Sequence, residues 1–301
     1  MKKLIATAAA LAAVSAFSVA AFADAYVTIS DETGKIVVAM MPIELTDNDG
    51  DGNITVNDVL ISAHDEFYAD GNGSAEESYA TVDSDYGPMI TKLWGVGNGG
   101  AYGYYINNVA GMSLNDPIKD NDHLYAFVYT DAQNYSDKYT YFDQPTYTYD
   151  GIAPDTQPSI ELHLSAAAFD ENWSPVTVPV EGATITINDE KTDFVTDSTG
   201  TVTVDLPGGR DGVYIISAVS ETETIVPPIT LVKVVVDENA TDDNIEDNGA
   251  QEITDAPETG DVDAATDSSK GSPDTGIADV AAVAGIAVLA AGAFIAAKNR
   301  K

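Results

Sequence analysis

Residues 47–58, DNDGDGNITVND, bring together side chains that could bind a metal ion. Carboxylates occupy the first, third and fifth positions, and a fourth carboxylate closes the stretch at the twelfth. A glycine at the sixth position permits the sharp turn that such a loop needs. This spacing is that of a calcium loop, in which the seventh position offers its backbone carbonyl. The sequence therefore predicts a calcium site with the ligands Asp47, Asp49, Asp51, Asn53, Thr55 and Asp58.

The elements predicted on either side of this loop indicate what the ion would do. Residues 35–46 have the pattern of a strand, whereas residues 55–68 repeat apolar side chains at helical spacing. A calcium sensor needs paired helix–loop–helix units that open, and here one loop joins a strand to a helix. We therefore expect a structural fastener. The loop resembles one half of a dockerin, but the second half that a dockerin requires is missing from the chain.

Sequence patterns that indicate a catalytic site are weak in this chain, and we do not expect it to be an enzyme. The chain has no cysteine, which excludes disulfides and thiolate sites. Its histidines, His64, His123 and His163, have no recognisable partner set, and we expect the first two at the surface. The stretch GVGNGG at 95–100 matches a nucleotide-binding spacing, but an aromatic strand follows it where the binding helix would be needed.

Aromatic side chains are concentrated between residues 94 and 149. Such residues bind sugars and flat ligands, but they also pack well across neighbouring strands, and both interpretations stay open. Alternation puts Tyr125, Phe127 and Tyr129 on one face of a strand and Leu124, Ala126 and Val128 on the other. The candidate binding face consists of Trp94, Tyr102, Tyr104, Tyr125 and Tyr129.

The first 23 residues are predicted to be a secretory signal peptide. Lys2 and Lys3 precede an apolar run, and the sequence Ala-Phe-Ala at 21–23 fits the cleavage site, which would leave Asp24 as the first residue of the exported chain.

The C-terminus has the features of an anchor. Residues 277–297 are apolar apart from Asp279 and are long enough to span a bilayer. Lys298, Arg300 and Lys301 follow directly, so the C-terminus should be cytoplasmic and the upstream chain extracellular.

The pentapeptide SPDTG precedes this span, and pentapeptide, span and basic tail (272–301) together resemble the sortase sorting signal of Gram-positive bacteria. The common form of the motif begins with Leu, and Ser stands here instead. The resemblance implies that a sortase cuts after Thr275 and joins the chain to peptidoglycan. The motif residues are Ser272, Pro273, Asp274, Thr275 and Gly276.

Between its ends the chain divides by composition. Residues 237–271 are acidic, without aromatic side chains, and are predicted to form a disordered linker. Residues 159–236 alternate apolar and polar side chains between turn signals, which predicts an all-β sandwich. This segment resembles the Ig-like or prealbumin-like spacers of bacterial surface proteins. Some of these carry an internal Lys–Asn isopeptide bond, and Lys191 and Lys233 are candidates for it by residue type alone.

Residues 24–150 are predicted to form an α+β domain. The segments YGPMITKLWGV, YGYYINN and SLNDPIKDNDHLYAFVY resemble the family called domain of unknown function 4430, which is related to the C-terminal domain of the transcobalamins. This resemblance implies a β-grasp-like fold. Asn107-Asn108 replaces the family's Asn-Gly, and the calcium loop is inserted between hairpin and helix.

These features together predict a cell-wall-anchored surface protein. A calcium-stabilised binding or adhesion domain would be displayed on a spacer and a stalk, with an extracellular glycan, protein or small molecule as its ligand. A formal charge of −36 argues against nucleic acid as a partner. The first alternative is capture of a small ligand such as a cobamide, and the second is a role as accessory to a cell-surface hydrolase.

Overall fold

The computed structural model describes residues 24–240 except 72, 86, 98, 100, 155, 173, 209 and 210. The predicted signal peptide (1–23), the sorting signal and all but the first residues of the acidic linker lie outside the described residues. Within the described part, no helix is long and apolar enough to cross a membrane, and the predicted span at 277–297 falls outside it. The described chain is mostly β-sheet with two short α-helices.

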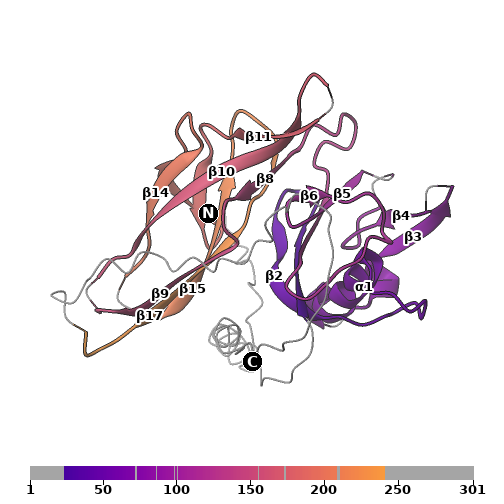
Figure 1. Ribbon diagram of the computed structural model, residues 1–301, viewed down its shortest axis with the longest axis horizontal. Coiled ribbons are helices and arrows are strands. Elements are labelled where there is room, and N and C mark those ends of the chain that lie inside the picture. The colour runs from indigo at the N-terminus through magenta and orange to yellow at the C-terminus, as the bar shows by residue number, and fades with distance from the viewer. Residues whose placement is uncertain are drawn as a thin grey trace, which may run out of the picture. The chain divides into compact units, whose positions relative to one another are not determined.

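The N-terminal half is built on a mixed five-stranded sheet in the order β2-β1-β7-β5-β6 (Figure 1). The central strands β1 and β7 are parallel, and the pairs β1–β2, β7–β5 and β5–β6 are antiparallel. The strands are β1 (Asp24–Ser30), β2 (Ile36–Glu44), β5 (Tyr102–Ile106), β6 (Val109–Ala110) and β7 (His123–Val128).

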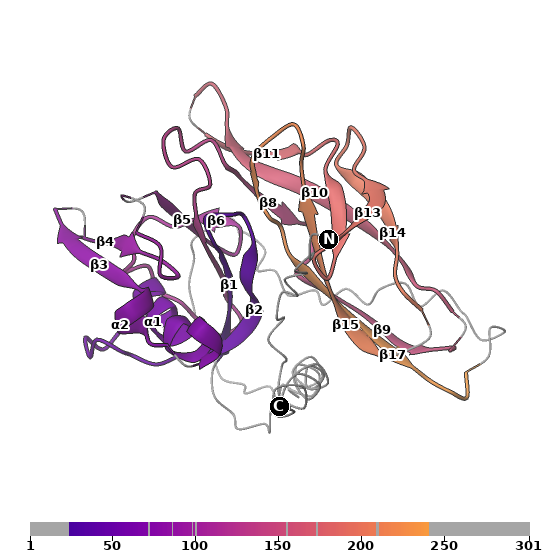
Figure 2. The ribbon, with the colours of Figure 1, turned by 180° about the vertical axis from the view of Figure 1, so that it is seen from behind.

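Helix α1 (Val56–Phe67) lies against one face of this sheet (Figure 2). Its buried stripe packs on β1, β2 and β7, as its helical spacing predicts. Each fully buried side chain such as Leu60 contributes roughly 1.5–3 kcal/mol. The helix is followed by η1 (Tyr68–Gly71), α2 (Ala75–Ser78) and the hairpin of β3 (Ala80–Ser84) and β4 (Gly87–Lys92).

The C-terminal half is a sandwich of two sheets. One has the order β11-β10-β8-β16, with β14 also paired to β10, and the other has the order β13-β12-β15-β17-β9. Every second side chain of β10 is buried from Ile160 to Ala166, which is the alternation expected of a strand with one face in a core. The strands are β8 (Lys138–Phe142), β9 (Thr146–Ile152), β10 (Ser159–Phe169), β11 (Pro175–Pro179), β12 (Thr184–Ile187), β13 (Glu190–Val195), β14 (Thr201–Asp205), β15 (Gly212–Val219), β16 (Ile225–Val226) and β17 (Thr230–Val236).

Most of residues 138–152, which the sequence placed in the N-terminal domain (24–150), form two strands that pair with strands of the sandwich instead. Strand β8 pairs with β10 and β16, and β9 runs parallel to β17 from Thr146↔Leu231 to Ile152↔Val236. The reason is that partners far along the chain complete the sandwich sheets, and strand pairing over such distances leaves no local signal in the sequence. The N-terminal sheet therefore takes its last strand, β7, from residues that end at Val128.

The second face of the N-terminal sheet is also covered. Tyr125 and Phe127 of β7 pack with Tyr139 of β8 and with Val226 and Ile229 in one buried cluster. The rings of Tyr105 and Tyr139 stack with centroids 3.6 Å apart, and the Tyr125 hydroxyl donates a hydrogen bond to the carbonyl of Pro227. The sheet is thus buried on both sides, by α1 on one face and by residues of the sandwich half on the other.

Candidate functional site

The loop between β2 and α1 brings three carboxylates together. One oxygen from each of Asp47, Asp49 and Asp58 lies within 4.8 Å of the other two, so the group could hold a metal ion. Asp58 is fully buried, whereas Asp49 is exposed and the group is therefore open to solvent on one side. All three donors are hard oxygen ligands, which fit a hard cation such as calcium.

Backbone hydrogen bonds shape this loop around Asp47. Its carboxylate accepts the N–H groups of Gly50 and Gly52 at 2.7 and 2.9 Å, and that of Asp51 at 3.2 Å. The φ angles of Gly50 and Gly52 are +77° and +90°, a region that favours glycine. These hydrogen bonds, that of Gly52 first, lower the pKa of Asp47.

The electrostatics of the loop favour a cation. Desolvation, together with repulsion from the Asp51, Asp58 and Asp47 carboxylates, raises the pKa of Asp49. A divalent ion among these groups would relieve that repulsion.

Asp58 links the loop to the helix. Its Oδ1 accepts the N–H of Asn48 at 2.8 Å, and its Oδ2 accepts the N–H and the hydroxyl of Thr55 at 3.0 and 2.6 Å. Thr55 is the N-cap of α1, and the two residues form a reciprocal capping box. The same carboxylate therefore belongs to the acidic triad and begins the helix.

The other predicted ligands lie differently. Asp51 accepts hydrogen bonds from the backbone and side-chain N–H groups of Asn53 at 2.8 and 3.0 Å and does not belong to the triad. The Thr55 hydroxyl donates to Asp58 within the capping box. A cation at the triad would therefore need further oxygen ligands, because calcium takes about six to eight.

The candidate binding face needs a correction at Tyr125. Only 2% of this residue is exposed, and its hydroxyl is bound to Pro227, so it cannot touch a partner. The alternation predicted for residues 124–129 is confirmed, but both faces of the strand are buried. The remaining members are half-buried and packed against the two clusters: Trp94, Tyr102, Tyr104 and Tyr129.

The prediction of a surface position for His64 is also wrong, because this residue is fully buried. Its ring lies between α1 and the turn that follows β4, and burial lowers its pKa to about 4. The sequence does indicate the burial of His64, because this residue continues the apolar stripe of Val56 and Leu60 at intervals of four residues. His123 is partly buried, its Nε2 lies 2.8 Å from Thr28 Oγ1, and burial lowers its pKa to about 4.

An exposed apolar surface was not predicted. Val82 and Met89 face each other across β3 and β4 and are 49% and 50% exposed. The turn of this hairpin lies against the loop after β6, since a Cβ on Gly87 would lie 3.5 Å from Ser113 Oγ. We call this region the methionine surface, and it consists of Val82, Met89, Val109 and Met112.

Met112 is the most exposed of these side chains, at 89%, and its loop is held in shape. The carboxylate of Asp116 accepts the N–H groups of Met112 and Ser113 at 2.7 and 3.0 Å. Flexible and polarisable methionine side chains on a fixed backbone can adapt to different apolar partners. Strand patterns in the sequence did not reveal this surface because single exposed apolar residues carry no periodic signal.

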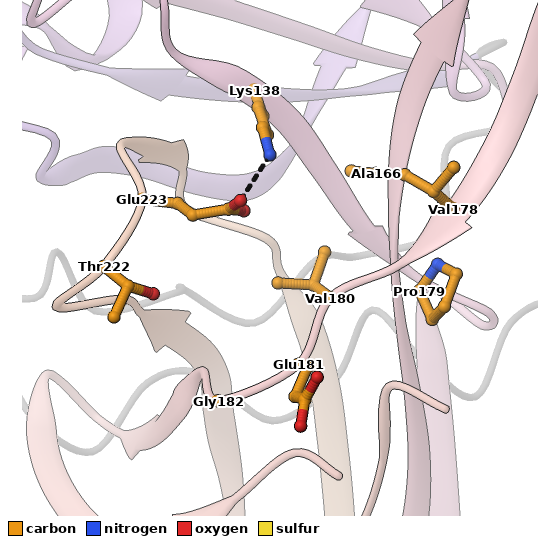
Figure 3. A pocket seen from close by; sticks show the side chains of 9 residues that line it. All are labelled: Lys138, Ala166, Val178, Pro179, Val180, Glu181, Gly182, Thr222 and Glu223. Atoms are coloured by element: carbon orange, nitrogen blue, oxygen red, sulfur yellow. Dashed lines mark hydrogen bonds and ion pairs between the residues drawn. The ribbon is translucent and has the colours of Figure 1, made fainter. Parts of the chain in front are cut away.

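Two shallow cavities lie on the sandwich, and neither is lined by Trp94 or Gly97. The larger, of about 490 Å³, has apolar walls of Ala166, Val178 and Val180, beside an ion pair of Lys138 with Glu223 (Figure 3). The smaller, of about 370 Å³, lies near Lys191, which pairs at the surface with Glu221 at 3.8 Å.

A scan against protein-family models and a search of the curated proteins found no match for this chain.

Proposed function

We propose that this chain is a cell-wall-anchored surface protein whose N-terminal half binds an extracellular partner. The observation that supports binding is the methionine surface, in which the exposed side chains of Val82 and Met89 are cross-strand partners and the turn of their hairpin lies near Ser113, next to exposed Met112. Anchoring rests on the sequence of the sorting signal at 272–301. The strongly acidic chain would favour a partner with cationic groups around an apolar centre.

We also propose that the N-terminal half is β-grasp-like. The parallel central pair β1 and β7, and a helix placed after the first hairpin, support this assignment. The half-buried side chains Trp94, Tyr102, Tyr104 and Tyr129 would then contribute to binding only at their exposed edges.

Calcium is the ion that we propose for the acidic triad, as a structural fastener. Asp58 supports this role, because it is both a member of the triad and the residue that caps α1. An ion there would set the position of the helix start relative to the end of β2. Weak affinity would suffice in an extracellular setting, with a Kd on the order of 10⁻⁴–10⁻³ M.

A binding screen tests the proposed function. The purified full chain is applied to arrays of glycans, proteins and metabolites, together with the double variant Met89→Ser, Met112→Ser. Partners that bind the wild type and are lost with the double variant support the methionine surface. The control is Phe169→Ser, which removes a side chain that is 61% exposed on the sandwich. Partners that bind the double variant equally well would contradict the assignment of the site.

Capture of a small ligand such as a cobamide has less support. It would require a concave site near Trp94 and Gly97, whereas the two cavities described above lie on the sandwich. Metabolite hits in the same screen that persist in the double variant would favour this alternative.

A further inference from the structure

His64 joins two elements through its two ring nitrogens. Nδ1 lies 2.6 Å from the carbonyl oxygen of Leu60, one turn earlier in α1, and Nε2 lies 3.0 Å from the backbone nitrogen of Trp94. The Trp94 N–H can only donate, so Nε2 accepts, and the Leu60 carbonyl can only accept, so Nδ1 carries the hydrogen. This arrangement requires the neutral ring in a single tautomer.

The segment held by Nε2 is a tight turn at the end of β4. Leu93 and Val96 exchange backbone hydrogen bonds at 3.0 and 2.9 Å. Trp94 lies between them with a φ of +51°, which is unfavourable for a residue with a side chain. Gly95 has a φ of +77° and donates its N–H to the Ser78 carbonyl at 2.7 Å. The turn is therefore strained, and external contacts hold it in place.

The surroundings of the His64 ring are mostly aromatic. Its ring lies 5.0 Å from that of Tyr79 and 5.3 Å from that of Trp94, and the Tyr68 ring meets Trp94 edge-on. The Tyr79 hydroxyl is bound to Asn57 at 2.9 Å. The charged group that acts on His64 is Asp65, the next residue of α1, whose carboxylate accepts the Ala75 N–H at 2.6 Å.

We propose that His64 is an acid-operated latch on the Trp94 turn. A proton on Nε2 turns this acceptor into a donor that faces the N–H of Trp94, so the hydrogen bond is lost and two donors oppose each other. The strained turn then opens and the ring gains access to water. Any effect on partner binding rests on the proposed function, because Trp94 belongs to the candidate binding face, but the latch itself does not.

The direction and size of the effect follow from proton linkage. In the closed turn burial lowers the pKa of His64 to about 4, whereas a ring released to solvent has its ordinary pKa of 6.5. The open form binds the proton more tightly, so opening increases as the pH falls below 6.5 and levels off below about 4. The ratio of the open to the closed form should rise by roughly 100-fold between pH 7 and pH 4, toward a limit of about 300-fold at still lower pH.

Amide hydrogen exchange of the full chain between pH 7 and pH 4 tests the latch. After correction for the intrinsic pH dependence of exchange, protection of the Trp94 amide should fall by roughly 100-fold. Protection of the Val232 amide in the sandwich core should not follow the same curve. In His64→Gln the side-chain carbonyl can still accept from Trp94 but cannot titrate, so the fall should disappear. His123→Gln is the matched control and should keep it.

Two results would overturn the proposal: Trp94 protection that does not change with pH, or an equal fall in His64→Gln. If that variant does not fold, the wild-type ¹⁵N shifts of the imidazole decide. The Nε2 resonance of His64 and the Trp94 amide resonance should then titrate together, and separate midpoints would contradict the latch. Neither outcome depends on the partner screen, so the proposed function can fail independently.

Discussion

At the scale of single residues, Asp58 has the most consequences for the proposed ion site. It is fully buried, and its two oxygens accept three hydrogen bonds from Asn48 and Thr55. A carboxylate that is satisfied in this way is fixed in position before any ion binds. Preorganisation of this kind lowers the entropy that binding would otherwise cost.

The triad predicts that calcium stabilises the fold. At a hundredfold excess of calcium over Kd, the free energy of unfolding should rise by about 2.7 kcal/mol. The double variant Asp47→Asn, Asp49→Asn should lose this increase, because two of the three carboxylates become neutral. Melting curves with calcium and with a chelator measure it, and Asp83→Asn, an exposed carboxylate on β3, is the control. Coinciding wild-type curves would rule out the fastener. Asp58→Ala is unsuitable because it would also remove the helix cap.

The buried hydroxyl of Tyr125 gives a second prediction at this scale. In Tyr125→Phe the ring stays in its cluster, but the carbonyl of Pro227 loses its donor. A buried polar group left without a partner costs about 1–3 kcal/mol, so urea unfolding should show a loss of this size with an unchanged m-value. Tyr135→Phe, at a residue 53% exposed, should show none. Equal stabilities of the two variants would mean that the Pro227 contact contributes nothing.

At the scale of elements, the sequence predicted those that depend on local patterns. Helix α1 forms where the apolar spacing placed it, and the acidic loop precedes it with three of its predicted ligands together. The burial of other side chains depends on residues that are distant in the sequence. The alternation in β7 was predictable, but whether Tyr125 faces solvent depends on β8 and β16, which follow later in the chain. The burial of His64 likewise depends on a turn 30 residues away.

The edge strand β11 explains how the sandwich avoids unwanted pairing. The backbone N–H of Val180 donates to the Leu164 carbonyl, and that of Asp170 donates to the Ser174 carbonyl. In this register the even-numbered residues of β11 direct their backbone N–H and C=O groups toward β10, and the odd-numbered residues direct theirs away from it. Two of the three outward positions of β11 are Pro175 and Pro179, which have no N–H. Only Thr177 can donate to an incoming strand, and such an edge resists self-association.

The two prolines at the outer edge of β11 predict the effect of restoring the missing N–H donors. In the double variant Pro175→Val, Pro179→Val, the outer edge of β11 would offer three N–H groups in a row beside exposed Val176 and Val178. Light scattering should then show concentration-dependent self-association that the wild type lacks. Pro154→Val, in a turn outside the strands, is the control. A double variant as monodisperse as the wild type would show that the prolines do not protect the edge.

At the scale of the whole molecule, the proposed sorting signal at 272–301 predicts where the chain resides. The Thr275→Ala variant should fail to join peptidoglycan, because the sortase would have no threonine to transfer. Cell fractionation should find the wild type in the wall and the variant in the membrane fraction or the medium. Asp274→Asn, which changes the variable position of the motif, should remain in the wall. Wall attachment of Thr275→Ala at the wild-type level would contradict sortase anchoring.

The parallel pairing of β9 and β17 has a mechanical consequence. In a protein tethered at its C-terminus, tension from the tether enters the sandwich at Val236. Thr146 and Val236 lie at opposite ends of the pair, so a pull between them acts along both strands and strains all their hydrogen bonds together, in shear. A pull between Thr146 and Leu231, which face each other at one end, would break the bonds one after another.

The cysteine-free sequence allows this difference to be measured directly. Cysteines introduced at positions 146 and 236, or at 146 and 231, serve as handles in a single-molecule pulling experiment. The first geometry should rupture at a clearly higher force than the second, and equal forces would contradict the shear arrangement. A strand pair connected in this way resists tension between Thr146 and Val236 with hydrogen bonds that bear the load together.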